Sequence, residues 1–172
     1  MQSLSHVRET LRHAGLQTTL HFLNDRVPHR FTAVYQLNGD LLRSVAIVDK
    51  AGEVVPEHLL AVPLGSSFCQ FVLRDGFFNL HGDHDERLEG HPYQGVVESY
   101  VGVPLSRDGS VLIGTFCHFD FPPLAISDEE FVFMQQVAKE LPAYVVKPGT
   151  LSGSGAASIL PHLQTLREGK GR

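Results

Sequence analysis

The feature that most constrains the fold is a pair of apolar runs between Ser99 and Asp120, joined at Asp108-Gly109. An Asp-Gly pair tolerates the positive backbone dihedrals of a tight hairpin turn, so the two runs predict antiparallel strands. Side chains along a strand alternate between the two faces of a sheet. In the second run neither face is hydrophilic, since one face carries Val111, Ile113, Thr115, Cys117 and Phe119 and the other carries Leu112, Gly114, Phe116, His118 and Asp120. We therefore expect this hairpin to be covered on both sides.

Apolar residues spaced by three and four positions predict a helix at each end of the chain. The first runs from Leu4 to about Leu23 and is interrupted by Gly15. The last begins after Ser127, which can form a capping box with Glu130, and its apolar stripe ends before Pro142. Together these helices could cover one face of a sheet, and any surplus apolar surface on them would mark a homodimer contact.

The segments between the two helices predict further strands. Residues 31–37 and 41–49 flank a turn at 38–40 and predict a second hairpin. Residues 53–65 are expected to be irregular, and a short helix capped by Ser66 and a brief strand at 77–80 follow them. Because hairpins join antiparallel strands, the predicted fold class is α+β.

Composition narrows the range of functions. The chain has 172 residues, of which 42% are hydrophobic and 19% charged, as is ordinary for one globular domain. Its net charge of -5 argues against nucleic acid as a partner, because phosphate binding needs a basic surface. No apolar run approaches the roughly 20 residues of a membrane helix, and no signal-peptide block precedes the domain. We therefore expect a cytoplasmic protein with no membrane partner, whose two cysteines are reduced.

The chain is predicted to divide into three parts. Residues 1–26 form an N-terminal helical segment, and residues 27–145 form the domain itself. Residues 146–172 are rich in glycine and serine at their start and lack core-forming residues there, so we expect a flexible tail.

A series of motifs resembles the GAF domain family, a group of small-molecule sensory modules. The motifs, which span roughly residues 16–141, are RFTAVY at 30–35, PLGSSFC at 63–69, DER at 85–87 before His91-Pro92, SYVGVPL at 99–105, and IGTFCHFD at 113–120. The resemblance implies a GAF/PAS-like central antiparallel sheet of five or six strands. Helices would cover one face, and a ligand pocket would lie on the other under a lid of loop and short helix. Members of the family bind cyclic nucleotides, tetrapyrroles, amino-acid derivatives or anions, so the cofactor of this chain stays unknown.

Ser66, Ser67 and Cys69 form the first candidate site. If Ser66 caps a helix, the amides after it form a seat for a ligand carboxylate or phosphate. Cys69 would lie in the first turn, where a thiolate is favoured. The alternative is an ordinary cap followed by a small buried cysteine.

Cys117, His118 and Asp120 form the second candidate site. Adjacent strand residues face opposite sides, so Cys117 and His118 cannot both line one pocket without a bulge. A His118–Asp120 pair could fix a histidine tautomer beside a ligand. The alternatives are simple strand packing, with Asp120 capping the next turn, and a Cys69–Cys117 disulfide.

The polar segment from His81 to Pro92 could hold a metal, through His81, Asp83, His84, Asp85, Glu86 and His91, or serve as a solvated lid. Its spacing matches no compact ligand motif, and no motif singles out a haem ligand, so we predict no metal site. The family resemblance implies that Asp85 and Arg87 belong to the lid. The complete set predicted to bind the ligand is Ser66, Ser67, Cys69, Asp85, Arg87, Tyr100, Cys117, His118 and Asp120.

Three functions follow from these observations. The first is a non-enzymatic, small-molecule-binding signalling module, because no nucleophile, base and orienting group are assembled in the sequence. The second is an enzyme like the free methionine-(R)-sulfoxide reductases of this family, which would need reactive cysteines in the segment equivalent to 80–98, where this chain has none. The third is a protein-interaction module whose pocket is filled by its own aromatic side chains.

Overall fold

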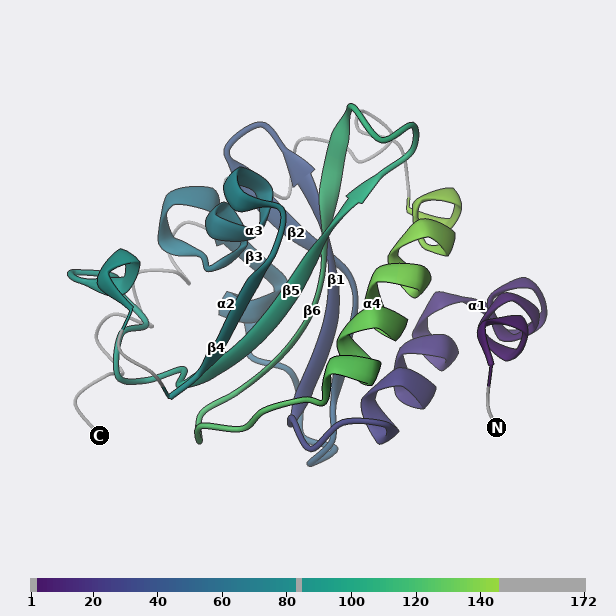
Figure 1. The fold of residues 1–172 in the computed structure, drawn as a ribbon, viewed down its shortest axis with the longest axis horizontal. Helices are drawn as coiled ribbons and strands as arrows, with labels where there is room; N and C mark the ends of the chain where they lie inside the picture. Colours follow the sequence, from purple (N-terminus) through teal and green to yellow (C-terminus); the bar gives the residue numbers. More distant parts are fainter. Residues whose placement is uncertain (1–2, 83–84, 146–172) are drawn as a thin grey trace.

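The computed structural model describes residues 3–82 and 85–145, so the predicted tail at 146–172 lies outside the described residues. A six-stranded antiparallel sheet forms the centre of the fold, in the order β3-β2-β1-β6-β5-β4 (Figure 1). The strands are β1 (Phe31–Asn38), β2 (Leu41–Asp49), β3 (Ala61–Pro63), β4 (Phe78–His81), β5 (Ser99–Ser106) and β6 (Leu112–Asp120). The helices are α1 (Leu4–Asp25), α2 (Glu57–Leu60), α3 (Cys69–Asp75) and α4 (Asp128–Glu140), with single 3-10 turns η1 (Leu64–Ser66), η2 (Glu86–Leu88) and η3 (Pro142–Tyr144). The predicted α+β class and the central antiparallel sheet of five or six strands are confirmed.

Both predicted hairpins form, and their inner strands β1 and β6 pair at the centre of the sheet. The connection between β5 and β6 is wider than a two-residue turn and spans residues 107–111. Within it the Asp108 carboxylate accepts hydrogen bonds from the backbone N–H groups of Ser110 and Val111, both at 2.9 Å. The register shifts where this loop joins the strands, so Ile113 packs on the same side as Phe116 rather than with Thr115 as expected.

The sheet is buried on both faces, as its hairpin sequence predicts. One face packs against α1 and α4, which lie together in Figure 1, and we call this the helix-side core. The other face packs against α3 and the segments around it, and we call this the cavity-side core. The helix-side core includes Val34, Val103, Phe116 and Met134. The cavity-side core includes Tyr35, Cys69, Tyr100 and Cys117.

The segment that was expected to be irregular contains α2 and β3, so that part of the prediction was wrong. β3 pairs with β2 through Leu42 and Val62 and forms one edge of the sheet. The strand is only three residues long, and Pro63 ends it. β3 forms because it pairs with the otherwise open edge of β2. The sequence of residues 53–65 carries no local signal of that pairing.

Candidate functional site

A cavity of about 50 Å³ lies between α3, the sheet and the loop that follows η2. Since one water needs about 10–15 Å³, this volume holds a few waters or one small molecule. Its walls come from nearly every part of the cavity-side core, namely Tyr35, Leu42, Leu59, Val62, Ser67, Phe68, Cys69, Tyr93, Val97, Tyr100 and Phe119.

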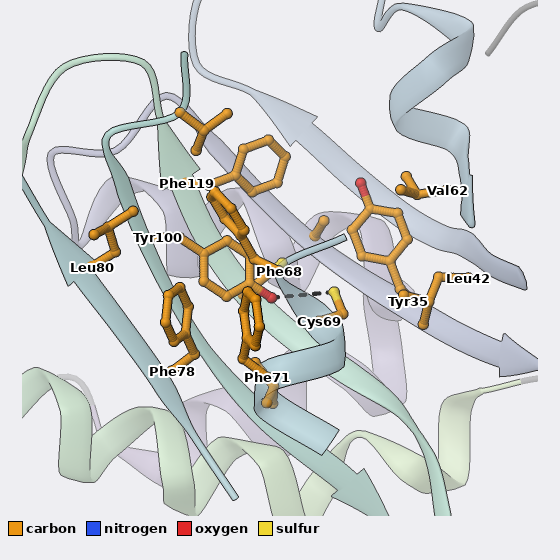
Figure 2. Close-up of a cluster of buried hydrophobic side chains, with 14 of the residues drawn as sticks. Tyr35, Leu42, Val62, Phe68, Cys69, Phe71, Phe78, Leu80, Tyr100 and Phe119 are labelled. Atoms are coloured by element: carbon orange, nitrogen blue, oxygen red, sulfur yellow. Dashed lines mark hydrogen bonds between the residues drawn. The ribbon is translucent and has the colours of Figure 1, made fainter. Parts of the chain in front are cut away.

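Aromatic rings make the wall beneath α3. Phe68 packs against Tyr100 with ring centroids 5.4 Å apart and against His91 at 4.7 Å. Phe78 lies 5.7 Å from Phe68 and 5.8 Å from Tyr100, which closes the cluster (Figure 2). Such offset and edge-on contacts stabilise the packing of these rings against one another.

Gly102 leaves the space in which Tyr100 lies. A Cβ atom at position 102 would come within 2.7 Å of Tyr100 Cε1 and 2.9 Å of Val72 Cγ2. Without that atom the tyrosine ring can lie flat along β5 and direct its hydroxyl group to Cys69 Sγ, at 3.2 Å. The glycine of the SYVGVPL motif thus determines how the polar end of the cavity is built.

The cavity is neutral apart from its thiol. None of the residues that line it carries a formally charged side chain. Burial raises the pKa of Tyr35 and of Tyr100 well above the usual value for tyrosine, so both hydroxyls stay protonated. The Tyr35 hydroxyl donates its proton to the carbonyl oxygen of Leu59 at 2.7 Å, so it does not donate to a ligand in this arrangement.

The two cysteines lie next to each other in the cavity-side core. Cys69 Sγ is 3.2 Å from both the Tyr100 hydroxyl and the Thr115 hydroxyl. Burial opposes ionisation of Cys69, but hydrogen bonds from Cys117, Ser67, Thr115 and Tyr100 outweigh it and lower the pKa of the Cys69 thiol. Burial, together with the neighbouring Cys69, raises the pKa of the Cys117 thiol.

Ser67, Cys69 and Tyr100 of the predicted set line the cavity. Cys117 is fully buried and adjoins Cys69 without reaching the cavity wall. Ser66 does not cap α3, because it ends the turn η1, and the backbone N–H of Cys69 donates instead to Ser67 Oγ at 2.9 Å. The expected anion seat behind Ser66 is therefore absent from this cavity.

His118 and Asp120 lie on the opposite face of the sheet and do not line the cavity. His118 Nδ1 is 2.7 Å from Thr32 Oγ1, and its ring packs on Phe116 in the helix-side core. The Asp120 carboxylate accepts hydrogen bonds from the backbone N–H groups of Arg30 and Phe121, at 2.8 and 2.7 Å. The predicted His118–Asp120 ligand pair is replaced by strand packing and a turn cap.

Asp85 and Arg87 belong to the segment beside α3 and β4 but also lie outside the cavity. The Arg87 guanidinium donates to the carboxylates of Asp85 and Asp75 at 2.7 and 2.9 Å. It also lies 4.6 Å above the ring of Phe78. Arg87 therefore connects the lid segment to α3 and covers the aromatic cluster from outside.

Among residues 3–82 and 85–145, no group of three or more His, Cys, Asp or Glu side chains is arranged so that it could hold a metal ion. Asp83 and His84 of that cluster lie outside the described residues. In the same part of the chain no helix combines the length and hydropathy of a membrane span.

Sequence reasoning missed several residues that build the cavity. Tyr35 is opposite Thr115 in the pairing of β1 with β6, which places both on the face that carries Cys117. That position could have been inferred once the central pair of strands was aligned. Tyr93 reaches the cavity from the loop after η2, and no periodic pattern in that loop marks it.

Comparisons with solved structures place this architecture among GAF domains. The GAF domain of an Acinetobacter phosphoenolpyruvate-protein phosphotransferase superposes with a TM-score of 0.66 at 16% identity, over 82% of this chain and 89% of the other. The phycocyanobilin-bound GAF domain of a cyanobacterial phytochrome gives 0.60 at 13% identity, over 94% of each chain. A type II free methionine-R-sulfoxide reductase from Thermoplasma acidophilum gives 0.59 at 20% identity, over 82% of this chain and 99% of the reductase. No protein-family model and no curated protein matches the sequence.

Proposed function

We propose that this chain, a protein with the GAF fold, is a non-enzymatic cytoplasmic sensor module that binds a small uncharged molecule in the cavity beside Cys69. The observation that carries the proposal is the concave site itself, walled by aromatic rings and supplied with a serine, a thiol and tyrosine hydroxyls. Cavities of this kind, mostly apolar with a few convergent polar groups, are the usual sites of small ligands.

The chemistry of the wall favours a particular class of ligand. An anionic ligand would lose its hydration on entry, and the lining offers no positive charge to compensate for that loss. The volume of about 50 Å³ suits a compact molecule of a few heavy atoms, such as a short alcohol or a small thioether. A cyclic nucleotide or tetrapyrrole would require α2 and the loop after η2 to move away from the sheet.

A thermal-shift screen of the reduced full chain tests the proposal. The panel contains short alcohols, thioethers, indole, amino acids, nucleotides, biliverdin and small anions, and native mass spectrometry identifies any molecule that co-purifies. We expect stabilisation by small neutral compounds, because a ligand that binds only the folded state adds about 2.7 kcal/mol at one hundred times its Kd. Anions should leave the melting temperature unchanged.

Two neighbouring residues of α2 supply matched variants. Leu59 lines the cavity, whereas Leu60 is 39% exposed and does not. Leu59→Phe should fill the cavity and abolish the ligand-induced shift, and Leu60→Phe should retain it. If no compound stabilises the chain and only bare polypeptide is detected, the proposal fails and a protein-interaction module with a degenerate pocket takes its place.

The enzyme alternative is the reduction of free methionine sulfoxide. The likeness to the Thermoplasma reductase supports it at the level of fold. Against it, the segment 80–98 contains no cysteine. We expect no turnover of free methionine-(R)-sulfoxide with a dithiol reductant, and measurable turnover that requires Cys69 would replace the sensor proposal with this one.

We also propose that the module forms a homodimer through α1 and α4. Val132 of α4 is 51% exposed and lies outside the apolar stripe that packs on the sheet. Such a side chain on the outer surface of a helix layer could contribute to a contact between two copies.

A further inference from the structure

We propose that Cys69 and Cys117 form a peroxide-responsive dithiol site, in which Cys69 is oxidised first and Cys117 then resolves it to an intramolecular disulfide. The site needs a route for a small neutral oxidant and two thiols in contact, and it does not depend on any resident ligand. It would give the chain an oxidation-dependent state in addition to its proposed ligand-bound state.

The geometry that carries this inference comes from three elements. α3 begins at Cys69, whose backbone N–H is fixed by Ser67 Oγ, and the thiol points down onto β6. Thr115 and Cys117 are two residues apart on the face of β6 beneath it. Cys69 Sγ lies 3.2 Å from the Thr115 hydroxyl, and both cysteines belong to the same buried cluster. Tyr100 approaches the same sulfur from β5 (Figure 2).

Access distinguishes the two thiols. Cys69 is part of the cavity wall, so a molecule as small as hydrogen peroxide that enters the cavity meets its sulfur. Cys117 has no exposed surface and is not part of the wall. Its one route to oxidation is therefore through Cys69.

The acidity of the two thiols supports the same order of reaction as their accessibility does. The hydroxyls of Tyr100 and Thr115 can both donate to a thiolate at Cys69, and these bonds contribute to the lower pKa of that thiol. Cys117 keeps its proton, because burial and the adjacent Cys69 raise its pKa. The thiolate is the nucleophile in such reactions, so Cys69 is the attacking sulfur.

The chemistry balances in two steps. The Cys69 thiolate attacks one oxygen of the peroxide, the O–O bond breaks, and the leaving hydroxide takes up a proton, which leaves a sulfenic acid on Cys69 and one water. The sulfur of Cys117 then attacks the sulfur of the sulfenic acid. The S–O bond breaks, an S–S bond forms, and the departing hydroxide leaves as water with the Cys117 proton. The dithiol loses two electrons and the peroxide gains them.

The test treats the reduced full chain with hydrogen peroxide and follows it by non-reducing peptide mass spectrometry. We expect a linked pair of peptides that contain Cys69 and Cys117, and its disappearance after treatment with dithiothreitol. In Cys117→Ala the reaction should stop at a sulfenic acid on Cys69 that dimedone traps. In Cys69→Ala thiol loss should slow by about tenfold or more, because the remaining thiol is neither acidic nor accessible.

A further variant separates this site from nonspecific oxidation of an unfolded chain. Thr115→Val removes one hydroxyl from Cys69 Sγ and should move the pH midpoint of the oxidation rate upward, while circular dichroism confirms that each variant is folded. The inference is overturned if folded wild-type protein yields no Cys69–Cys117 link, or if dimedone labels Cys117 first. Because the ligand screen uses reduced protein, its outcome is independent of this one.

Discussion

His118 is fixed in its orientation by a chain of hydrogen bonds that begins at Asn24. The Asn24 side-chain amide donates to Thr32 Oγ1 at 2.8 Å, and the Thr32 hydroxyl is hydrogen-bonded to His118 Nδ1 at 2.7 Å. Burial, assisted by the nearby His29, Lys50 and Arg26, lowers the pKa of His118 to about 3. Each of these side chains contributes to the stability of the protein rather than to the cavity.

This arrangement predicts a loss of stability in acid. The unfolded chain takes up a proton on His118 near its ordinary pKa of about 6.5, and the folded chain does so only near about 3. The unfolded state therefore binds more protons within that window, and the free energy of unfolding falls as the pH decreases through it. The slope for this one group is at most about 1.4 kcal/mol per pH unit.

Urea unfolding between about pH 7 and about pH 4 measures this slope. His118→Asn keeps an acceptor for Thr32 but does not titrate, so its slope should be smaller than that of the wild type. Equal slopes in the wild type and in His118→Asn would show that the folded protein protonates this histidine without cost.

Two helices show how an element responds to residues outside it. α1 is interrupted at Gly15, with φ +88° and ψ 178°, and its two halves bury Val7 and Leu11, and Leu20 and Leu23, in the helix-side core. α4 begins with Ser127 Oγ accepting from the Glu130 backbone N–H at 3.1 Å, which is half of the predicted capping box. The other half is missing, because the Glu130 carboxylate forms a bidentate ion pair with Arg26 of the segment after α1.

The interruption in α1 predicts the effect of an alanine at position 15. Gly15 lies in a backbone region that only glycine adopts readily, so Gly15→Ala should lower the free energy of unfolding by about 1–3 kcal/mol. There is open space around the position, so the loss would come from backbone strain and not from a clash. Gly65 also has open space but no positive φ, and Gly65→Ala should change stability by less than about 1 kcal/mol in the same denaturation experiment. Equal losses in both variants would contradict this explanation.

The whole molecule buries apolar side chains in two layers, one on each face of the sheet. The apolar stripes of α1 and α4 are buried in the helix-side core, because four of their residues are at most 2% exposed, namely Leu11, Leu20, Met134 and Val137. On the cavity side, aromatic rings occupy most of the space that a larger ligand would need. The fold is therefore closely packed on the helix side and retains a small space on the other.

The proposed homodimer yields a prediction at this scale. Val132→Glu should convert the dimer to a monomer, because a carboxylate on the outer surface of α4 would be buried without a partner in the interface. Gln94→Glu introduces the same charge at an exposed position of the loop after η2, away from α1 and α4, and should remain dimeric. Light scattering after size exclusion measures both, and a monomeric wild type at high concentration would refute the proposed dimer.

Much of the fold could be predicted from local patterns in the sequence. The turn at 38–40, the double-sided hairpin of 99–120 and the break at Gly15 all appear where short-range physics requires them. The candidate site was predicted less well. Of its predicted residues, three reach the cavity, namely Ser67, Cys69 and Tyr100. The other six do not line it, namely Ser66, Asp85, Arg87, Cys117, His118 and Asp120.

The sequence by itself determined that β6 has two buried faces and that Cys117 and His118 lie on different ones, because side-chain alternation is a property of the extended backbone. Only the tertiary structure decided which face received the helices and which received the cavity. That choice depends on where α1, α3 and α4 pack, and contacts between distant segments leave no periodic signal within a strand. The juxtaposition of Cys69 with Cys117, 48 positions apart in the chain, is decided in the same way.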